Sequence, residues 1–188
     1  MSDSPKNRIH IFGGAGAGST TLGENIAKAK NISHFDADNY LWKGDCHDYL
    51  YRKLRNPIER NSLLDRDLRI ESSWILSGRV CGWGDFAIRL FDVVIFLDVP
   101  HKERMNRYVS RNIKRHGNDL LKTKHPLHNI FILFKNWASS YEDGQNALYS
   151  KNRHEKWIEK LFCPVVRIEG NLTAEQTLNI ALKKISQL

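Results

Sequence analysis

The chain has 188 residues, 41% of them hydrophobic, and a formal net charge of +8. This length suits one domain with a sizeable core, and no repeat or low-complexity tract divides it. The longest strongly apolar run, Val93–Leu97, is far too short to span a membrane, and the first residues lack a secretory pattern, which together predict a cytoplasmic protein with no membrane segment.

The cysteines and the charge narrow the class of protein further. Cys46, Cys81 and Cys163 are odd in number and form no Cys-x-x-Cys pair, which predicts free thiols and argues against a disulfide framework or a structural zinc site. The positive charge is typical of proteins that bind phosphates or nucleic acid. Nucleic acid stays an alternative partner, supported by the charge alone.

A glycine-rich loop lies between the first predicted strand, Ile9–Phe12, and a helix pattern. The phosphate-loop pattern Gly-x-x-x-x-Gly-Lys-[Ser/Thr] fits in one phase only, Gly13 to Thr20, with Ser19 in place of the lysine. Backbone amides and a helix N-terminus can hold an anion without that lysine. The predicted nucleotide-binding residues of this loop are Gly13, Gly14, Ala15, Gly16, Ala17, Gly18, Ser19, Thr20 and Thr21. Thr20 is also the predicted Mg²⁺ ligand; an ordinary glycine-rich turn is the alternative.

Two carboxylates, Asp36 and Asp38, end the second predicted strand and are spaced to lie on the same face of it. The carboxyl ends of parallel strands share one edge of a sheet, so both should lie beside the glycine loop. We predict that Asp38 takes a proton from an acceptor hydroxyl, or orients Mg²⁺ through water, and that Asp36 contacts the acceptor. A solvated turn is the alternative for each.

Residues from about 40 to 70 begin polar, aromatic and basic, which predicts an insert that covers the acceptor. Within it, Asn56-Pro57-Ile58-Glu59 predicts a helix start, because asparagine is a good N-cap and proline suits the first helical position. Arg55, just before that helix, is a candidate for binding an anionic acceptor.

The third predicted strand, Trp74–Leu76, ends at Ser77-Gly78-Arg79 and is followed by another glycine-containing loop. This loop should lie at the same strand-end level as the first one. Gly78, Arg79 and Trp83 are therefore predicted to contact the acceptor, with Arg79 binding its anionic group. Trp83 either stacks on a ring or plugs the core.

After the apolar strand Asp92–Asp98, a helix is predicted from about His101 to His116. Met105, Val109 and Ile113 should face the core. Four arginines, at 104, 107, 111 and 115, fall on one stripe of this helix. We predict that the stripe supplies the charge that Ser19 does not, with Arg107 on the nucleotide and Arg111 and Arg115 in catalysis. A solvated basic face or a nucleic-acid contact is the alternative.

The last third of the chain continues the pattern of helices and strands. Residues 115–126 are predicted to form a short lid-like segment. A long helical face, Leu127–Tyr141, precedes a helix near Lys151–Leu161 and a final strand, Pro164–Ile168. Thr173-Ala174-Glu175-Gln176 is a capping box that opens the last helix.

In this order the motifs resemble the P-loop small-molecule kinases, namely the adenylate-kinase-like and shikimate-kinase-like proteins. The motifs that carry the resemblance are Gly13–Thr20, Phe35–Asp38, Leu76–Gly78 and Phe96–Pro100. Gly-Ser-Thr-Thr-Leu, Ser-Gly-x-x-Cys-Gly-Trp-Gly-Asp and Trp-Ala-Ser-Ser-Tyr-Glu-Asp-Gly are similar to a bacterial adenylate-kinase-like subgroup, here with a lysine-less Walker A loop.

The resemblance implies one α/β domain over residues 1–188, a three-layer fold with helices on both faces of a parallel five-stranded sheet of order 2-3-1-4-5. It also implies ATP and Mg²⁺ as cofactors, and transfer of a γ-phosphoryl group to a small acceptor, which the basic candidate residues predict to be anionic. A catalytically weakened nucleotide-binding sensor is the alternative that Ser19 suggests, and a nucleic-acid-binding protein is a second one.

Overall fold

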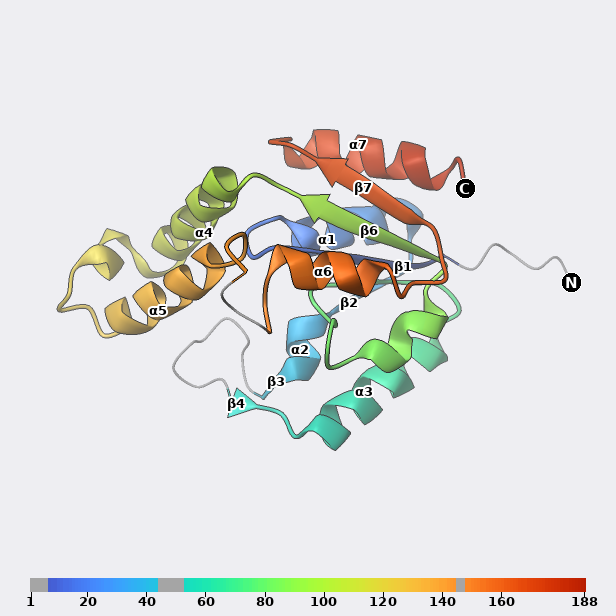
Figure 1. Cartoon of the computed structure of the whole chain (residues 1–188), viewed down its shortest axis with the longest axis horizontal. Helices are drawn as coiled ribbons and strands as arrows, with labels where there is room; N and C mark the ends of the chain where they lie inside the picture. The colour runs from blue at the N-terminus through green and yellow to red at the C-terminus, as the bar shows by residue number, and fades with distance from the viewer. Residues whose placement is uncertain (1–6, 44–52, 145–147) are drawn as a thin grey trace, which may run out of the picture.

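The computed structural model describes residues 7–43, 53–144 and 148–188, and Figure 1 shows their arrangement. A parallel five-stranded sheet lies at the centre, made of β1 (Arg8–Gly13), β2 (Ser33–Asp36), β5 (Trp74–Ser77), β6 (Val93–Asp98) and β7 (Val165–Glu169). The strand order is β2-β5-β1-β6-β7. Counted along the chain within this sheet, that order is 2-3-1-4-5, so the predicted fold class is confirmed.

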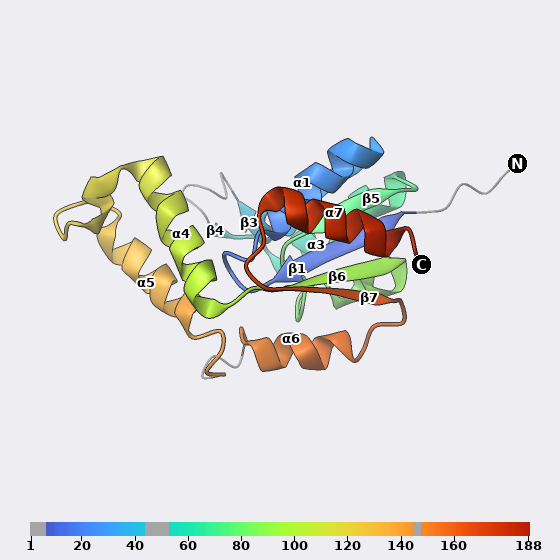
Figure 2. The same cartoon turned by 90° about the horizontal axis from the view of Figure 1, so that it is seen from above.

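Helices cover both faces of the sheet because successive residues of each strand point to opposite sides. In β1, Ile9 and Ile11 pack on one face and Phe12 on the other. The first face is covered by α1 (Ser19–Lys30) and α7 (Ala174–Ile185). The second is covered by α2 (Ala37–Leu41), α3 (Pro57–Ile70), the 3-10 helix η1 (Asp85–Leu90) and α6 (Lys151–Ile158). Figure 2 shows α7 and α6 on opposite sides of the sheet.

Local signals in the sequence place the helix ends correctly. Asn56 caps α3 by accepting a hydrogen bond from the Ile58 amide at 2.9 Å, and Pro57 is the first helical residue. Thr173 and Gln176 form the predicted capping box of α7, each side chain bonded to the other's backbone amide. These contacts satisfy amides that have no partner within the helix.

Helices α4 (His101–His116) and α5 (His128–Ser139) form a hairpin that projects from the carboxyl edge of the sheet (Figures 1 and 2). The 3-10 helix η2 (Asn118–Leu121) lies in the connection, so the predicted lid-like segment 115–126 forms the hairpin's tip. Tyr108, Leu120 and Phe131 make a small apolar cluster of the hairpin's own.

The prediction for the buried face of α4 was wrong. Arg104, Tyr108 and Asn112 are the buried residues, while Met105, Val109 and Ile113 are only half-buried. The reason is that α4 leaves the sheet. Arg104 packs under the glycine loop and Tyr108 stacks on Phe131 of α5, so apolar spacing alone does not identify the inner side of the helix.

The predicted insert, residues 40–70, contributes to the core as well as to the surface. Tyr40, Leu64 and Leu68 belong to the apolar cluster beneath α2 and α3. A short antiparallel pair, β3 (Trp42–Lys43) and β4 (Lys53–Leu54), lies beyond them, and residues 44–52 of the insert are outside the described residues. Cys81 and Cys163 are free thiols, as predicted, while Cys46 lies outside the described residues. None of the helices that the structure describes combines the length and apolar character needed to cross a bilayer.

Candidate functional site

The glycine loop connects β1 to α1 at the carboxyl edge of the sheet, and its neighbours leave no room for a side chain at Gly13 or Gly16. Gly16 and Gly18 have φ of +85° and +97°, a region that glycine adopts easily. A Cβ on Gly13 would lie 2.5 Å from the Leu97 carbonyl oxygen, and one on Gly16 would overlap the Arg104 carbonyl oxygen. The loop therefore needs these glycines for close packing as well as for its turns.

The N-terminus of α1 opens onto this loop without a cap. Gly18 is the N-cap residue and has no side chain to bond the first amides, and the first turn contains no acidic residue. The amides of Ser19, Thr20 and Thr21 have no acceptor within the helix, so with the positive end of the helix dipole they form a site suited to an anion. This arrangement requires no lysine at Ser19.

Thr20 and Asp36 are brought together, as the sequence predicts for residues at this edge. The Thr20 hydroxyl donates a hydrogen bond to Asp36 Oδ2 at 3.0 Å, and Asp36 Oδ1 accepts one from the Asp38 amide at 2.9 Å. Asp36 is therefore the N-cap of α2. Asp38 does not share a strand face with Asp36, because the strand ends first and Asp38 lies exposed in the first turn of α2.

Arg104 is buried under the loop with its charge paired. It is 1% exposed, and its guanidinium donates to the carbonyls of Val99 at 3.2 Å and Ala15 at 3.1 Å. It also forms an ion pair with Glu142 and lies 4.7 Å from the centre of the Tyr141 ring. Arg104 therefore supports the loop from below, with its charge already balanced.

Arg107 reaches the same loop from one turn further along α4. Its Nη1 donates to the Ala17 carbonyl at 3.4 Å, and its Nη2 donates to Leu172 O at 2.9 Å and Asn171 Oδ1 at 3.1 Å. No carboxylate of the described residues pairs with it. Arg107 thus brings an unbalanced positive charge to the loop.

The second half of the arginine stripe lies away from these contacts. Arg111 and Arg115 are both exposed, and the Arg111 guanidinium lies 5.8 Å from the Tyr108 ring centre. At about 1.5 Å of rise per residue, Arg115 is about 12 Å further along the helix axis than Arg107. Among the four arginines of the stripe, only Arg104 and Arg107 form hydrogen bonds with the glycine loop.

The second predicted loop begins where β5 ends. Gly78 has φ of +90°, and a Cβ there would lie 3.2 Å from Ala37. Arg79 donates to the Cys81 carbonyl at 3.0 Å, and burial lowers the pKa of its guanidinium. Trp83 donates to the Arg79 carbonyl at 2.8 Å and packs at the edge of the core, with the Arg60 guanidinium 5.1 Å from its ring centre. Trp83 is thus bound within the loop that presents Arg79.

Arg55 is occupied by contacts within its own segment. Its guanidinium donates to Glu59 at 2.8 Å, to the Tyr40 carbonyl at 3.1 Å and to the Trp42 carbonyl at 3.2 Å. These bonds join α2 and β3 to the start of α3, which is a structural use of the side chain.

An aromatic cluster that contacts the glycine loop was not predicted from the sequence. The Tyr149 hydroxyl accepts a hydrogen bond from the Ala15 amide, and the Tyr149 ring stacks on Trp137. The Tyr141 hydroxyl and His154 Nδ1 are bonded at 2.7 Å. Tyr149 and Ala15 are far apart in the chain, and the sequence signal was no more than aromatic residues recurring from 137 to 149.

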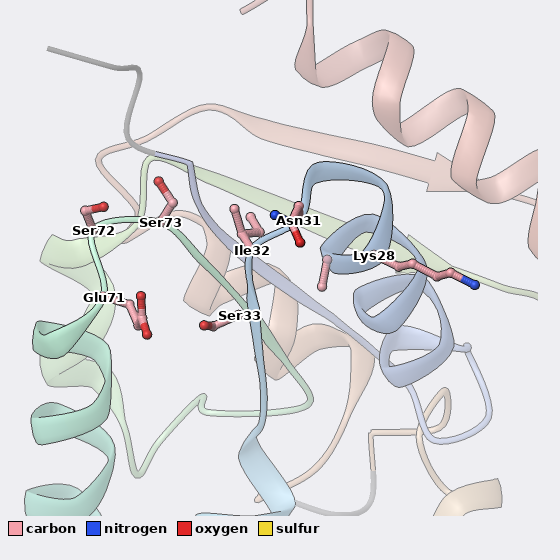
Figure 3. Close-up of a pocket in the computed structure, with 8 residues that line it drawn as sticks. Lys28, Asn31, Ile32, Ser33, Glu71, Ser72 and Ser73 are labelled. Atoms are coloured by element: carbon pink, nitrogen blue, oxygen red, sulfur yellow. The ribbon is translucent and has the colours of Figure 1, made fainter. Parts of the chain in front are cut away.

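Two hollows lie outside this site. One of about 540 Å³ lies at the amino ends of β2 and β5, the edge opposite the glycine loop (Figure 3). Its lining includes Lys28, Asn31, Ser33, Glu71, Ser72 and Ser73. The other, of about 330 Å³, lies beside α6 and is lined partly by Arg153, Lys156 and Lys160. Neither contains the predicted site residues.

Solved structures similar to this chain include several kinases of small molecules. The deoxyadenosine kinase from M. mycoides with bound dATP matches with a TM-score of 0.56 at 15% identity, covering 95% of this chain and 99% of that one. The shikimate kinase from Bacteroides thetaiotaomicron matches with a TM-score of 0.54 at 17% identity, covering 97% and 99%. At these identities the likeness establishes the fold, which is that of the P-loop kinases.

No protein-family model matches the chain. A full-length relative does: "Uncharacterized protein YqaC" of Bacillus subtilis is 37% identical over 183 residues, which are 96% of this chain and 98% of that protein. Identity at this level over nearly the whole of both chains means that the protein belongs to the family of YqaC.

Proposed function

We propose that the protein is a phosphotransferase that binds ATP with Mg²⁺ and moves the γ-phosphoryl group to a small anionic acceptor. The observation that carries this proposal is the hydrogen bond between Thr20 and Asp36, at the uncapped N-terminus of α1. A hydroxyl that follows the glycine loop, together with an aspartate carboxylate, is the pair that holds Mg²⁺ in P-loop enzymes.

The Thr20 and Asp36 oxygens suit Mg²⁺ chemically. Both are hard oxygen donors, and their separation is 3.0 Å. When bound, Mg²⁺ would neutralise phosphate charge, while the remaining work falls to the chain's own groups.

In this proposal, the free amides at the start of α1 and three arginines of α4 replace the missing lysine. The free amides at the start of α1 bind phosphate oxygens, and Arg107 adds a positive charge that no described carboxylate balances. Arg111 and Arg115 lie on the same stripe and are proposed to approach the transferred phosphoryl group during catalysis. Arg104 is assigned a supporting role because its charge is paired with Glu142.

The acceptor is proposed to bind between the second loop and α2. Burial lowers the pKa of Arg79, and no described carboxylate lies within ion-pair distance of it, so an anionic acceptor would supply the missing counter-charge. The acceptor hydroxyl attacks the γ-phosphorus, its proton passes to Asp38, and the bond to the β-phosphate oxygen breaks, which releases ADP. Asp36, Gly78 and Trp83 shape this side of the site.

The names of the similar structures support the proposal at the level of class. One is a deoxyadenosine kinase solved with dATP, and another is a shikimate kinase, whose name specifies an acidic acceptor. The free thiols Cys81 and Cys163 suit a reducing compartment such as the cytoplasm.

Calorimetry with ATP, in the presence and absence of Mg²⁺, tests nucleotide binding. Thr20→Val should remove most of the Mg²⁺-dependent gain in affinity, about 10-fold or more, because a charge-assisted contact contributes about 1.5–3 kcal/mol. Thr177→Val is the matched control, since its hydroxyl binds only within α7. Absence of heat for every nucleoside triphosphate tested with Mg²⁺ would overturn the proposal.

Phosphorus NMR with a panel of nucleoside monophosphates and hydroxy acids tests the transfer step. Arg79→Gln should raise KM for an anionic acceptor and leave ATP affinity unchanged, while exposed Arg89→Gln should change neither. Ser19→Lys distinguishes an enzyme from a nucleotide-binding sensor. If the variant has lower turnover than the wild type, other cations already occupy the lysine's place. If the wild type binds ATP tightly but transfers phosphate to no acceptor, the protein is a sensor and the proposed transfer activity is wrong.

A further inference from the structure

The amide of Ala15, the third residue of the glycine loop, is already hydrogen-bonded to a side chain. Its acceptor is the hydroxyl of Tyr149, which lies just before α6 and is 3% exposed. Loop amides of this kind are the groups that hold phosphate oxygens. The Tyr149 oxygen therefore occupies a place that a phosphate oxygen would take.

Neighbouring rings fix the Tyr149 side chain in this position. Its ring stacks on Trp137 of α5, with ring centres 3.9 Å apart and planes 19° apart, and it lies 5.0 Å from the ring of Tyr141. Tyr141 in turn packs on the loop, since a Cβ on Gly14 would lie 3.0 Å from its ring. The contact with Ala15 is thus held by packing of both rings against Tyr149.

The Tyr149 hydroxyl is neutral, which makes it a weaker partner for the amide than an anion. Burial, the largest effect, raises the pKa of this hydroxyl and Glu142 raises it further, against opposite effects of the Ala15 amide bond and of Arg104 and Arg79. A neutral oxygen on a loop amide makes a weaker bond than a phosphate oxygen, because charge-assisted hydrogen bonds are about twice as strong. A phosphate group that reaches the loop should therefore displace the hydroxyl.

We propose that Tyr149 is an internal stopper of the glycine loop, which occupies a phosphate-oxygen position in the free protein and leaves when a nucleoside triphosphate binds. This inference rests on the proposed function. Displacement would open the Trp137–Tyr149 stack. It would also pull on the start of α6, where Ser150 is the N-cap and Lys151 binds Asp98 at 2.6 and 2.8 Å.

Tyr149→Phe tests the stopper, because it keeps the ring stack and removes the hydroxyl. The variant should bind ATP with Mg²⁺, and pyrophosphate with Mg²⁺, about 3- to 10-fold more tightly than the wild type, the range expected for one net hydrogen bond. Tyr141→Phe is the matched control: it removes a hydroxyl from the same cluster, but one bonded to His154, so it should not tighten binding.

Two measurements on the protein itself accompany the binding data. Without ligand, the Ala15 amide should exchange its hydrogen faster in Tyr149→Phe than in the wild type, and pyrophosphate should slow the exchange again. Tryptophan fluorescence of the wild type should change on binding, and Trp137→Phe should abolish that change.

The outcomes distinguish failure of the proposed Tyr149 displacement from failure of the proposed function on which it rests. If the wild type and Tyr149→Phe bind the triphosphate with equal affinity, or if the variant binds more weakly, the stopper is overturned while the proposed function stands. If neither binds any triphosphate or pyrophosphate, the proposed function fails and the displacement fails with it.

Discussion

At the scale of single residues, the site depends on close approach between the glycine loop and α4. Arg104 donates to the Ala15 carbonyl, and its own carbonyl lies against Gly16. These contacts join the loop to α4, while the amides of Ser19, Thr20 and Thr21 at the start of α1 have no partner within the helix. The glycines at 13, 14 and 16 are therefore required by their neighbours, in addition to any need for unusual φ angles.

A comparison of Gly16→Ala with Gly170→Ala isolates this close approach. Both glycines have positive φ, +85° and +98°, so both variants should lose about 1–2 kcal/mol of stability from backbone strain. A Cβ at position 170 meets nothing within 4 Å, whereas at position 16 it overlaps the Arg104 carbonyl. Gly16→Ala should therefore lose at least about 1 kcal/mol more in urea unfolding. Equal losses of unfolding free energy would show that α4 shifts away from the added methyl group without cost.

Residues tied to short motifs were predictable, and residues tied to distant partners were not. The meeting of Thr20 with Asp36 follows from a loop motif, a strand end and the shared edge of a parallel sheet. The pairing of Arg104 with Glu142 and the contact of Tyr149 with Ala15 depend on where α5 and the segment before α6 fold back, which no local pattern encodes.

At the scale of elements, the α4–α5 hairpin departs most from the sequence prediction. Its helix bounds were predictable from periodicity, but its inner face was not, because Arg104 is buried among polar partners and Asn112 is buried with a hydrogen bond to the Tyr108 carbonyl of its own helix. The hairpin has a cluster of its own, built on Tyr108, Leu120 and Phe131 and separate from the two clusters on the sheet. A separate cluster predicts that the hairpin can loosen without the sheet.

Phe131→Ala tests that independence. The ring of Phe131 is 2% exposed and stacks on Tyr108 at 5.9 Å, so its removal leaves a cavity in the hairpin alone. Hydrogen exchange should accelerate by about 10-fold or more in α4 and α5, with β1 and β6 unchanged. Leu133→Ala, on the same helix but 66% exposed, should have no effect. Equal acceleration in the sheet would mean that hairpin and sheet unfold as one unit.

At the scale of the whole molecule, the sheet order was predictable because the motifs follow one another in the order of a known fold. The two-sided covering of the sheet explains why β6 is an unbroken apolar run, Val93–Leu97. It also buries two histidines on the α6 face, His10 on β1 and His154 on α6, both 0% exposed. Apolar patterning of a strand does not predict a buried imidazole such as His10.

These histidines give the fold a dependence on pH. Burial lowers the pKa of His10 to about 4, against a smaller opposite effect of its bond to the Leu76 carbonyl. Burial lowers the pKa of His154 to about 3, with a further contribution from nearby cations such as Arg79. Below about pH 6.5 the unfolded chain takes up protons that the folded chain does not, so stability is complete at pH 7 and falls on acidification.

Urea unfolding at pH 7, 6 and 5 should therefore show a falling free energy of unfolding. Each of the two histidines contributes a slope that approaches about 1.4 kcal/mol per pH unit between its unfolded and folded pKa values. His154→Gln keeps a polar partner for the Tyr141 hydroxyl and removes the titration, so it should lower stability at pH 7 and reduce the slope by about one proton. An unfolding free energy that stays constant from pH 7 to pH 5 would mean that protonated imidazole is tolerated beneath α6.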